Sequence, residues 1–380
     1  MRVLFVCPFV PWPLENGGKI RTYQLLRAAA REAQIDLAVI DDGTPRTEAE
    51  GALAEVVNDV HWFSRERAPL TKRLVRPKLE RWFHSPALER FLGTAKGYDL
   101  VHLDEMLLVR ALPPGRTPVL LHHHKLDRVL YELLTRDAGP KRHVDLFKLA
   151  RLEREATRRF PKQLFCSRED ADLFRATHPR VEPFVLPSGF DPDVFAPAPF
   201  DERDPSRLLF LGSMDYGPNV DGARWLIEDV LPRLSSALPS VKIELVGANP
   251  GAAVRALAGT RVEVTGRVAD VRPHLATAGA LVVPLSIGGG TRLKIVEALA
   301  MDTPVISTTI GAEGLGLEHG RHLLTADDGE SFARAVLELV GDRSAARRLA
   351  ETGGSFVRER FPWPRLGARL VEIWRDVASA

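Results

Sequence analysis

One stretch of the sequence decides the fold: Val283-Pro284-Leu285-Ser286-Ile287-Gly288-Gly289-Gly290-Thr291-Arg292-Leu293-Lys294-Ile295-Val296-Glu297-Ala298-Leu299-Ala300. It begins with the end of an apolar, strand-like run and passes through three glycines into a segment with helical periodicity. The pattern predicts a buried strand that ends at Pro284, a glycine-rich loop, and a helix that begins at Thr291.

The residue types in this stretch suit a nucleotide diphosphate. Glycines such as Gly289 and Gly290 let a phosphate approach the backbone, and a helix N-terminus offers unpaired N–H groups and a positive dipole. Arg292 and Lys294 add two positive charges for a diphosphate, and the Glu297 carboxylate can accept hydrogen bonds from two ribose hydroxyls. The alternative is a plain glycine-rich turn with a solvated basic face. The combination of strand, glycines, cations and carboxylate favours the phosphate site.

Outward from this stretch, short apolar runs alternate with longer helical patterns. Several runs are continuously hydrophobic, as parallel strands covered on both faces should be. The predicted strands cover residues 3–7, 35–40, 100–103, 119–122, 164–167, 184–187, 208–212, 242–247, 262–265, 280–284 and 304–307. Strands that alternate with helices indicate an α/β fold of two doubly wound, Rossmann-like units.

A stretch rich in Pro and Asp, residues 191–205, predicts the linker between the two units. The N-terminal domain is then expected at 1–190 and the C-terminal domain at 206–360. Residues 361–380 carry two helix-breaking prolines and then an amphipathic pattern, which predicts a helix that crosses back onto the N-terminal domain. Ligands of doubly wound sheets bind outside the carboxyl ends of the strands, so the site is expected in a cleft between facing domains.

Composition narrows the class of protein. The chain has 380 residues, 45% of them hydrophobic, which suits two globular domains. Its two cysteines, Cys7 and Cys166, lie in apolar runs and are interpreted as small buried residues in a reducing cytosol. No run of about 20 apolar residues predicts a membrane span. The net charge is only +2, but residues 61–162 hold 22 Lys or Arg against 12 Asp or Glu, which indicates an anionic partner.

The stretch at 283–300 resembles the C-terminal signature of retaining GT-B glycosyltransferases of family 4, in the bacterial branch of exopolysaccharide-type sugar transferases that reads Gly-Gly-Gly-Thr-Arg-Leu-Lys-Ile-x-Glu-Ala. Segments 186–195, 210–221 and 303–315 are similar to the family in the same order. The resemblance implies an N-terminal acceptor-binding domain and a C-terminal nucleotide-sugar-binding domain. It implies donor contacts from Gly212, Asn219, Gly289, Gly290, Thr291 and Glu297, with Arg292 and Lys294 as catalytic residues.

Two positions depart from the family pattern. Many members carry Glu-x7-Glu, and here Glu297 fills the second place while Gly289 stands in the first. Many members also place an Arg and a Lys after the first strand of the C-terminal domain, where this chain has Gly212-Ser213-Met214-Asp215. The charge of the diphosphate is therefore expected to fall mainly on Arg292 and Lys294.

Two loops of the N-terminal half resemble the family more loosely. Gly17 and Gly18 open a helix after the first strand, where the family lays a loop against the donor phosphate and acceptor. The run His122-His123-His124-Lys125-Leu126-Asp127 resembles the family's His-Asn-x-Glu loop, with His124 and Asp127 in the His and Glu places. A register one residue earlier would select His123 instead. A metal site is not expected, because adjacent residues of an extended chain point to opposite faces.

A basic segment, residues 64–92, runs from Ser64 to Leu92 with eight Lys or Arg, three Asp or Glu and several large apolar residues. It predicts a peripheral contact with an anionic membrane, with a solvated helix face as the alternative. A cytoplasmic protein on the inner face of the cell membrane, with a lipid-linked acceptor, fits this interpretation. Nucleic acid is not expected as a partner, because no nucleic-acid-binding motif accompanies the charge.

The resulting hypothesis is a retaining glycosyltransferase of polysaccharide, glycolipid or glycoconjugate biosynthesis. It needs no cofactor beyond the nucleotide diphosphate sugar, and no Asp-x-Asp-type motif predicts a required metal. Two alternatives stay open: a nucleotide-sugar epimerase on the same fold, and a non-catalytic sugar-nucleotide-binding subunit. A dinucleotide oxidoreductase is disfavoured, because no Gly-x-Gly-x-x-Gly follows the first strand.

Overall fold

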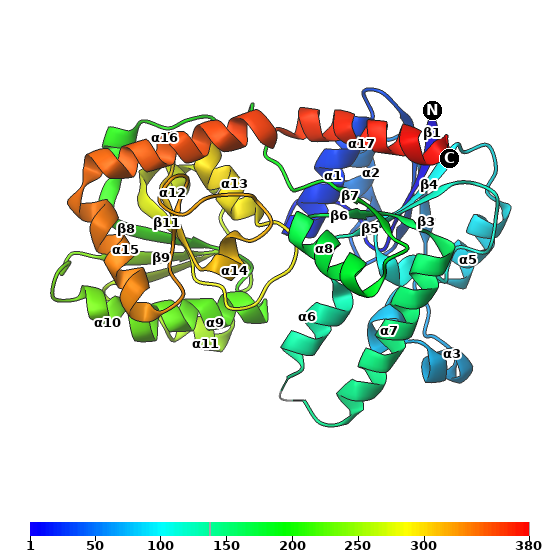
Figure 1. The fold of residues 1–380 in the computed structure, drawn as a ribbon, viewed down its shortest axis with the longest axis horizontal. Coiled ribbons are helices and arrows are strands. Elements are labelled where there is room, and N and C mark those ends of the chain that lie inside the picture. Colours follow the sequence, from blue (N-terminus) through cyan, green and yellow to red (C-terminus); the bar gives the residue numbers. More distant parts are fainter. Residues whose placement is uncertain (137, 380) are drawn as a thin grey trace. The chain divides into compact units, whose positions relative to one another are not determined.

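The computed structural model describes residues 1–136 and 138–379. The chain divides into two compact units (Figure 1). The first unit combines Met1–Pro187 with the C-terminal Trp363–Ala380, and the second is Ser188–Pro362.

The first unit is built on a parallel seven-stranded sheet whose order is β3-β2-β1-β4-β5-β6-β7. The order reverses between β1 and β4, which is the topological switch point where doubly wound sheets bind ligands. The strands are β1 (Arg2–Cys7), β2 (Gln34–Ile40), β3 (Asp59–Phe63), β4 (Leu100–Leu103), β5 (Val119–His123), β6 (Lys162–Phe165) and β7 (Glu182–Val185). The helices are α1 (Gly17–Ala29), α2 (Arg46–Ala54), α3 (Leu70–Val75), α4 (Lys78–Arg81), α5 (Pro86–Thr94), η1 (Met106–Leu108), α6 (Asp127–Leu134), α7 (Lys141–Arg159), α8 (Arg168–Thr177) and α17 (Trp363–Ala378).

The second unit repeats this plan with a parallel six-stranded sheet in the order β10-β9-β8-β11-β12-β13, which reverses between β8 and β11. Its strands are β8 (Asp204–Leu211), β9 (Lys242–Val246), β10 (Val262–Gly266), β11 (Ala278–Val283), β12 (Val305–Ser307) and β13 (Leu324–Thr325). Its helices are η2 (Phe200–Glu202), α9 (Gly217–Trp225), the π-helical turn η3 (Leu226–Val230), α10 (Leu231–Leu234), α11 (Ala252–Arg255), α12 (Arg272–Thr277), α13 (Leu293–Ala300), α14 (Thr309–Ala312), α15 (Gly329–Gly341) and α16 (Arg343–Arg360). The predicted fold class, two Rossmann-like α/β units, is therefore confirmed.

The C-terminal helix α17 belongs to the first unit, where it packs along α1 (Figure 1). It follows Pro362 and buries one apolar face that includes Leu370 and Trp374. A Cβ at Gly367 would lie 2.3 Å from the Cβ of Ala28, so glycine permits the close approach of the two helices. The chain thus returns to the first unit, as the amphipathic pattern predicts.

Two strands, β3 and β13, escape sequence-based prediction. The residues of β3 are only half-buried at the edge of the sheet and lack a continuous apolar run. Strand β13 has two residues and completes the other edge of the second sheet. Among the described residues, no helix is long and apolar enough to cross a membrane.

Candidate functional site

The glycine-rich segment follows β11 at the carboxyl edge of the second sheet. Its helix, α13, begins at Leu293 and not at Thr291 as predicted, because Arg292 has extended backbone angles (φ −92°, ψ 99°). Gly290 has a φ of +68°, a conformation that favours glycine. A Cβ at Gly288 would lie 1.6 Å from the Arg292 Nη2 atom, so this side chain occupies the space that the glycine leaves.

Arg292 folds back onto its own loop. Its Nη1 atom donates to the backbone oxygens of Gly289 at 2.6 Å and Gly290 at 2.8 Å, and its Nη2 atom donates to the Ile310 oxygen at 3.4 Å. Thr291 also acts within the protein, because its Oγ1 accepts from the Ser188 N–H at 2.7 Å. These contacts hold the glycine-rich loop in a defined shape.

Lys294 and Glu297 lie one turn apart on α13. The Lys294 Nζ atom donates to Asn219 Oδ1 at 3.3 Å and lies 4.8 Å from the centre of the Phe210 ring. Burial, together with the nearby charge of Arg292, lowers the pKa of Lys294 to about 7. Burial also raises the pKa of Glu297 to about 7, against the opposing charge of Lys294. Both groups are therefore poised for a ligand that supplies a negative charge or hydroxyl donors.

Gly212 and Asn219 bring the second loop of this unit against α13. Gly212 follows β8, and a Cβ there would lie 2.6 Å from Asn219 Nδ2. The same amide donates to the Ser213 oxygen at 2.9 Å, which leaves Asn219 Oδ1 directed at Lys294. The predicted donor residues of the second unit thus meet at the carboxyl ends of β8 and β11, on either side of the switch point.

The predicted glycines of the first unit open α1. Gly17 is the first residue of the helix, and the Asn16 side chain caps it by accepting from the Lys19 N–H at 3.0 Å. A Cβ at Gly18 would come no closer than 3.4 Å to any neighbouring atom, here Asn16 Oδ1. Packing within the unit therefore does not require glycine at this position.

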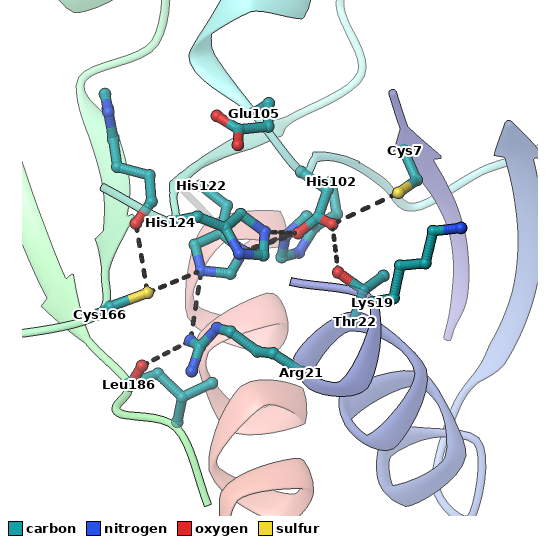
Figure 2. Close-up of polar contacts among 12 residues, drawn as sticks. Cys7, Lys19, Arg21, Thr22, His102, Glu105, His122, His124, Cys166 and Leu186 are labelled. Carbon is teal, nitrogen blue, oxygen red and sulfur yellow. Dashed lines mark hydrogen bonds and ion pairs between the residues drawn. The ribbon is translucent and has the colours of Figure 1, made fainter. Parts of the chain in front are cut away.

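Asp104, which sequence analysis missed, is the centre of a buried polar cluster in the first unit. Figure 2 labels side chains that bond to it, among them Thr22, His122 and His124. It follows β4 beside the switch point. Its Oδ1 atom accepts from His122 Nδ1 at 2.8 Å and from His124 Nε2 at 2.9 Å. Its Oδ2 atom accepts from Thr22 Oγ1 at 2.8 Å and from Cys7 Sγ at 3.6 Å.

This environment keeps Asp104 ionised. Burial by itself would raise the pKa of a carboxyl group. The charge of His124 and the hydrogen bonds from His102, His122 and His124 outweigh burial and hold the pKa of Asp104 well below its usual range. The cluster therefore contains a fixed buried negative charge.

Two donor-only groups define the tautomers of the buried histidines. The Trp374 indole N–H donates to His102 Nδ1 at 2.9 Å, so the proton of His102 lies on Nε2. The Arg21 guanidinium donates to His122 Nε2 at 3.3 Å, so the proton of His122 lies on Nδ1, facing Asp104. Burial lowers the pKa of both rings, that of His122 well below its ordinary value, and both are neutral.

His124 and His123 point in opposite directions, as neighbours in an extended segment should. His124 is partly exposed and stacks on His122, with ring centroids 4.4 Å apart. His123 is a core residue whose Nε2 lies 2.8 Å from Gln163 Oε1 and whose ring stacks on Phe165. Burial lowers the pKa of His123 to about 4. Of these two histidines, His124 is therefore the one with solvent-accessible surface.

Asp127, in the acidic place of the same loop, is the first residue of α6 and is buried. Lys125 Nζ lies 3.4 Å from Asp127 Oδ1 and 2.9 Å from Glu105 Oε1. These ion pairs fix the loop that carries His124.

The ligand atoms of His102, Asp104 and His122 lie within 4.8 Å of one another, the spacing of a metal site. Their nitrogens are committed to hydrogen bonds, however, and the Arg21 guanidinium beside His122 opposes a second cation. The geometry favours a hydrogen-bonded network that positions His124.

Comparisons with known proteins agree with this architecture. Residues 205–342 match the family described as "Glycosyl transferases group 1". An uncharacterised 44.6 kDa protein of the Klebsiella pneumoniae cps region is 25% identical over 95% of this chain and 96% of its own length. The lipopolysaccharide core biosynthesis glycosyltransferase LpsE of Rhizobium meliloti is 37% identical over 26% of this chain and 31% of its own length.

Among solved structures, Anabaena HepE in complex with UDP-glucose superposes with a TM-score of 0.72 and 17% identity, over 99% of this chain and all of that one. This likeness extends over both units and shows a shared fold. The chain is a glycosyltransferase with the GT-B fold, and residues 205–342 form its glycosyl transferases group 1 domain.

Proposed function

We propose that the protein transfers a sugar from a nucleotide diphosphate sugar to an acceptor hydroxyl, with retention of configuration at the anomeric carbon, in polysaccharide, glycolipid or glycoconjugate biosynthesis. The observation that carries this proposal is the contact of Lys294 with Asn219 beside the glycine-rich loop, at the carboxyl ends of β8 and β11, with Glu297 one turn further along α13. The named relatives support the pathway class, since they come from a cps region and from lipopolysaccharide core biosynthesis.

In the proposed reaction the bond between the anomeric carbon and the diphosphate breaks, and the acceptor oxygen bonds to the same face of that carbon. The acceptor proton passes to an oxygen of the departing diphosphate, so no separate protein base is needed. Lys294 and the backbone of the glycine-rich loop stabilise the negative charge that grows on the diphosphate. Glu297 accepts hydrogen bonds from the ribose hydroxyls.

In the first unit, His124 contacts the transferred sugar, and the start of α1 at Gly17 and Gly18 contributes to donor or acceptor binding. Asp104 positions His124 through the 2.9 Å hydrogen bond to Nε2. The reaction uses no cofactor and does not require a metal ion, so a chelator should leave the transfer rate unchanged.

A panel of UDP-, GDP-, ADP- and dTDP-sugars tests the proposal. We expect one donor to raise the melting temperature most, because a ligand stabilises the folded state by mass action. With that donor and membrane-derived acceptors, labelled sugar should appear in a glycoside of retained configuration. An epimerised nucleotide sugar as the product, or tight binding with neither transfer nor hydrolysis, would overturn the proposal in favour of an epimerase or a non-catalytic subunit.

Glu297→Ala should weaken donor binding by about 10- to 100-fold, since hydrogen bonds to a charged group contribute roughly 1.5–3 kcal/mol. Isothermal titration calorimetry with the donor from the panel measures this change. Glu338→Ala, at an exposed carboxylate on α15, is the matched control and should bind the donor like the wild type. Equal affinities in both variants would remove Glu297 from the ribose site.

The proposal also includes a contact between residues 64–92 and an anionic membrane. The structure supports it at α3, where Leu70 and Leu74 are 74% and 76% exposed. Two features of residues 64–92 differ from the predicted basic surface for the membrane. Leu79 and Phe83 pack on the core of the first unit. In addition, Lys72 pairs with Glu89 at 2.8 Å, which reduces the free positive charge.

Leu74→Ser should weaken binding to vesicles that contain anionic lipid by about tenfold, because the interface buries apolar side chains. Vesicle co-sedimentation measures the change. Val194→Ser, in the second unit, removes an apolar side chain that is 38% exposed and should have no effect. Unchanged binding by Leu74→Ser would exclude α3 from the membrane contact.

A further inference from the structure

A pocket of about 530 Å³ lies in the first unit between α7 and the segment 177–180 that leads into β7. This volume is typical of small-ligand sites, roughly 300–1,000 Å³. Four of its lining residues are arginines, Arg151, Arg154, Arg158 and Arg180. None of the lining residues is acidic.

The helix places three of these arginines in one row. Phe147, Arg151, Arg154 and Arg158 follow the spacing of a single face of α7, which is the face away from its buried side. Within the described part of the chain, none of the four arginines forms an ion pair with a carboxylate. The Nε atom of Arg154 donates only to the Ala150 oxygen of its own helix. The guanidinium groups are thus available to an external anion.

His178 closes the inner wall of the pocket without adding charge. Its ring stacks on Phe174, with centroids 4.4 Å apart, and burial lowers its pKa. The positive charge therefore comes from the four arginines, whose planar forks suit phosphate oxygens.

The pocket is separate from the residues of the proposed reaction. Segment 177–180 precedes β7, and Arg158 lies shortly before β6, so the pocket is at the amino ends of these parallel strands. Asp104 and His124 follow the carboxyl ends of β4 and β5. Parallel strands have all their carboxyl ends at one edge of the sheet, so the two sites are at opposite edges.

Two exposed apolar side chains of α7 lie at or next to the pocket. Phe147, which lines it, is 63% exposed, and Val144, one turn earlier on α7, is 54% exposed. Lys148 Nζ donates to the Arg73 oxygen at 3.4 Å, so α7 lies beside α3 (Figure 1). A soluble anion would make no favourable contact with exposed apolar side chains around its site. A lipid surface presents phosphate groups and hydrocarbon together, so it can contact both the arginines and the apolar side chains.

We propose that this pocket binds the phosphate head groups of anionic lipids, with Phe147 and Val144 entering the interface around it. The pocket would then anchor the first unit through α7, by residues outside the segment 64–92. This inference concerns a second lipid contact and does not depend on which sugar or acceptor the enzyme uses.

The test is co-sedimentation of the full-length protein with phosphatidylcholine vesicles that contain phosphatidylglycerol. The triple variant Arg151→Gln, Arg154→Gln, Arg158→Gln should bind about a hundredfold more weakly, since each Lys or Arg near an anionic surface changes affinity about fivefold. The control variant Arg224→Gln, Arg255→Gln, Arg348→Gln removes the same charge from exposed positions of the second unit and should bind nearly like the wild type. Equal losses of vesicle affinity in the two triple variants would show that binding depends on net charge alone, and would overturn the proposal that the pocket binds lipid.

Two further measurements complete the test. Phe147→Ser should weaken binding to vesicles without changing the melting temperature, because the side chain is exposed. Calorimetry with glycerol phosphate should show binding at least a hundredfold weaker than to vesicle phosphate, and comparable affinity would identify a soluble anion as the ligand. If Leu74→Ser weakens vesicle binding while the arginine variant does not, the pocket proposal fails and the contact of residues 64–92 stands.

Discussion

Replacing Lys294 by alanine should lower the rate of sugar transfer a hundredfold or more, while donor affinity falls much less. Charge on the diphosphate grows toward the transition state, so a cation held beside it stabilises that state most. Lys294 donates a hydrogen bond to Asn219 and is buried enough that its pKa is lowered to about 7. Interactions between charges are stronger in such buried surroundings than in water. The expected loss is about 2–4 kcal/mol, by comparison with oxyanion donors.

Single-turnover transfer at saturating donor measures this prediction. Lys294→Arg keeps a positive charge and should recover much of the rate. Without donor the wild type loses the Lys294 proton above pH 7, so its donor affinity should fall there, while that of Lys294→Arg should persist. Wild-type rates in Lys294→Ala would show that this side chain does not act on the leaving group.

Arg292→Ala should behave differently, because Arg292 hydrogen-bonds to the oxygens of Gly289 and Gly290. Its loss loosens the loop that shapes the phosphate site, so donor affinity and turnover should fall together. The double variant with Lys294→Ala should be less than additive, because the loop that Arg292 shapes and the Lys294 charge serve the same phosphate site.

The sequence allows most of the fold to be predicted, since buried parallel strands are continuous apolar runs and remain recognisable without their partners. It also identifies the loop at Gly289 and Gly290 and the residues that gather around it. The direction in which a side chain points cannot be predicted from the sequence in the same way. Arg292 has the charge expected of a phosphate ligand, but its guanidinium group donates to two backbone oxygens of its own loop and to the Ile310 oxygen on α14.

Asp104 could not be identified from its own segment, because two adjacent acidic residues, Asp104 and Glu105, after a short strand are typical of a solvated loop. Its burial arises from groups far along the chain, among them Thr22 on α1 and His122 on β5. One signal was present: Asp104 follows the strand next to β1, where the strand order reverses. Only the strand order, which the sequence does not give directly, identifies that position as the point where such sheets bind ligands.

The arginine pocket could not be predicted from the sequence for a similar reason. Arg151, Arg154 and Arg158 are recognisable as one face of a helix. Arg180 joins them only because the segment before β7 lies against α7 in the folded unit.

Replacing Asp104 by asparagine should lower the free energy of unfolding of the first unit by about 3 kcal/mol at pH 7. The carboxylate accepts hydrogen bonds from His122, His124 and Thr22, and hydrogen bonds to a charged group contribute roughly 1.5–3 kcal/mol each. An amide can accept at only one of the two oxygen positions, so part of this bonding is lost. Urea unfolding followed at α17 by hydrogen exchange measures the change.

The pH dependence of the free energy of unfolding distinguishes the charge of Asp104 from a simple packing contribution. His102, His122 and His123 are neutral in the folded protein because burial lowers their pKa values. In the unfolded chain these rings take up protons below about pH 6.5. Wild-type stability should therefore fall as the pH drops from 6.5, and His123 alone accounts for about 3 kcal/mol by pH 4.

The contribution of the Asp104 charge has a different pH range. Its folded pKa lies well below the usual range, so this contribution is present above the unfolded value near 4 and is lost only in stronger acid. The difference between wild type and Asp104→Asn should therefore stay constant from pH 7 to pH 5, while both proteins lose stability together. A difference between wild type and Asp104→Asn that disappears between pH 7 and pH 5 would mean that Asp104 is not the buried charge on which the histidines converge.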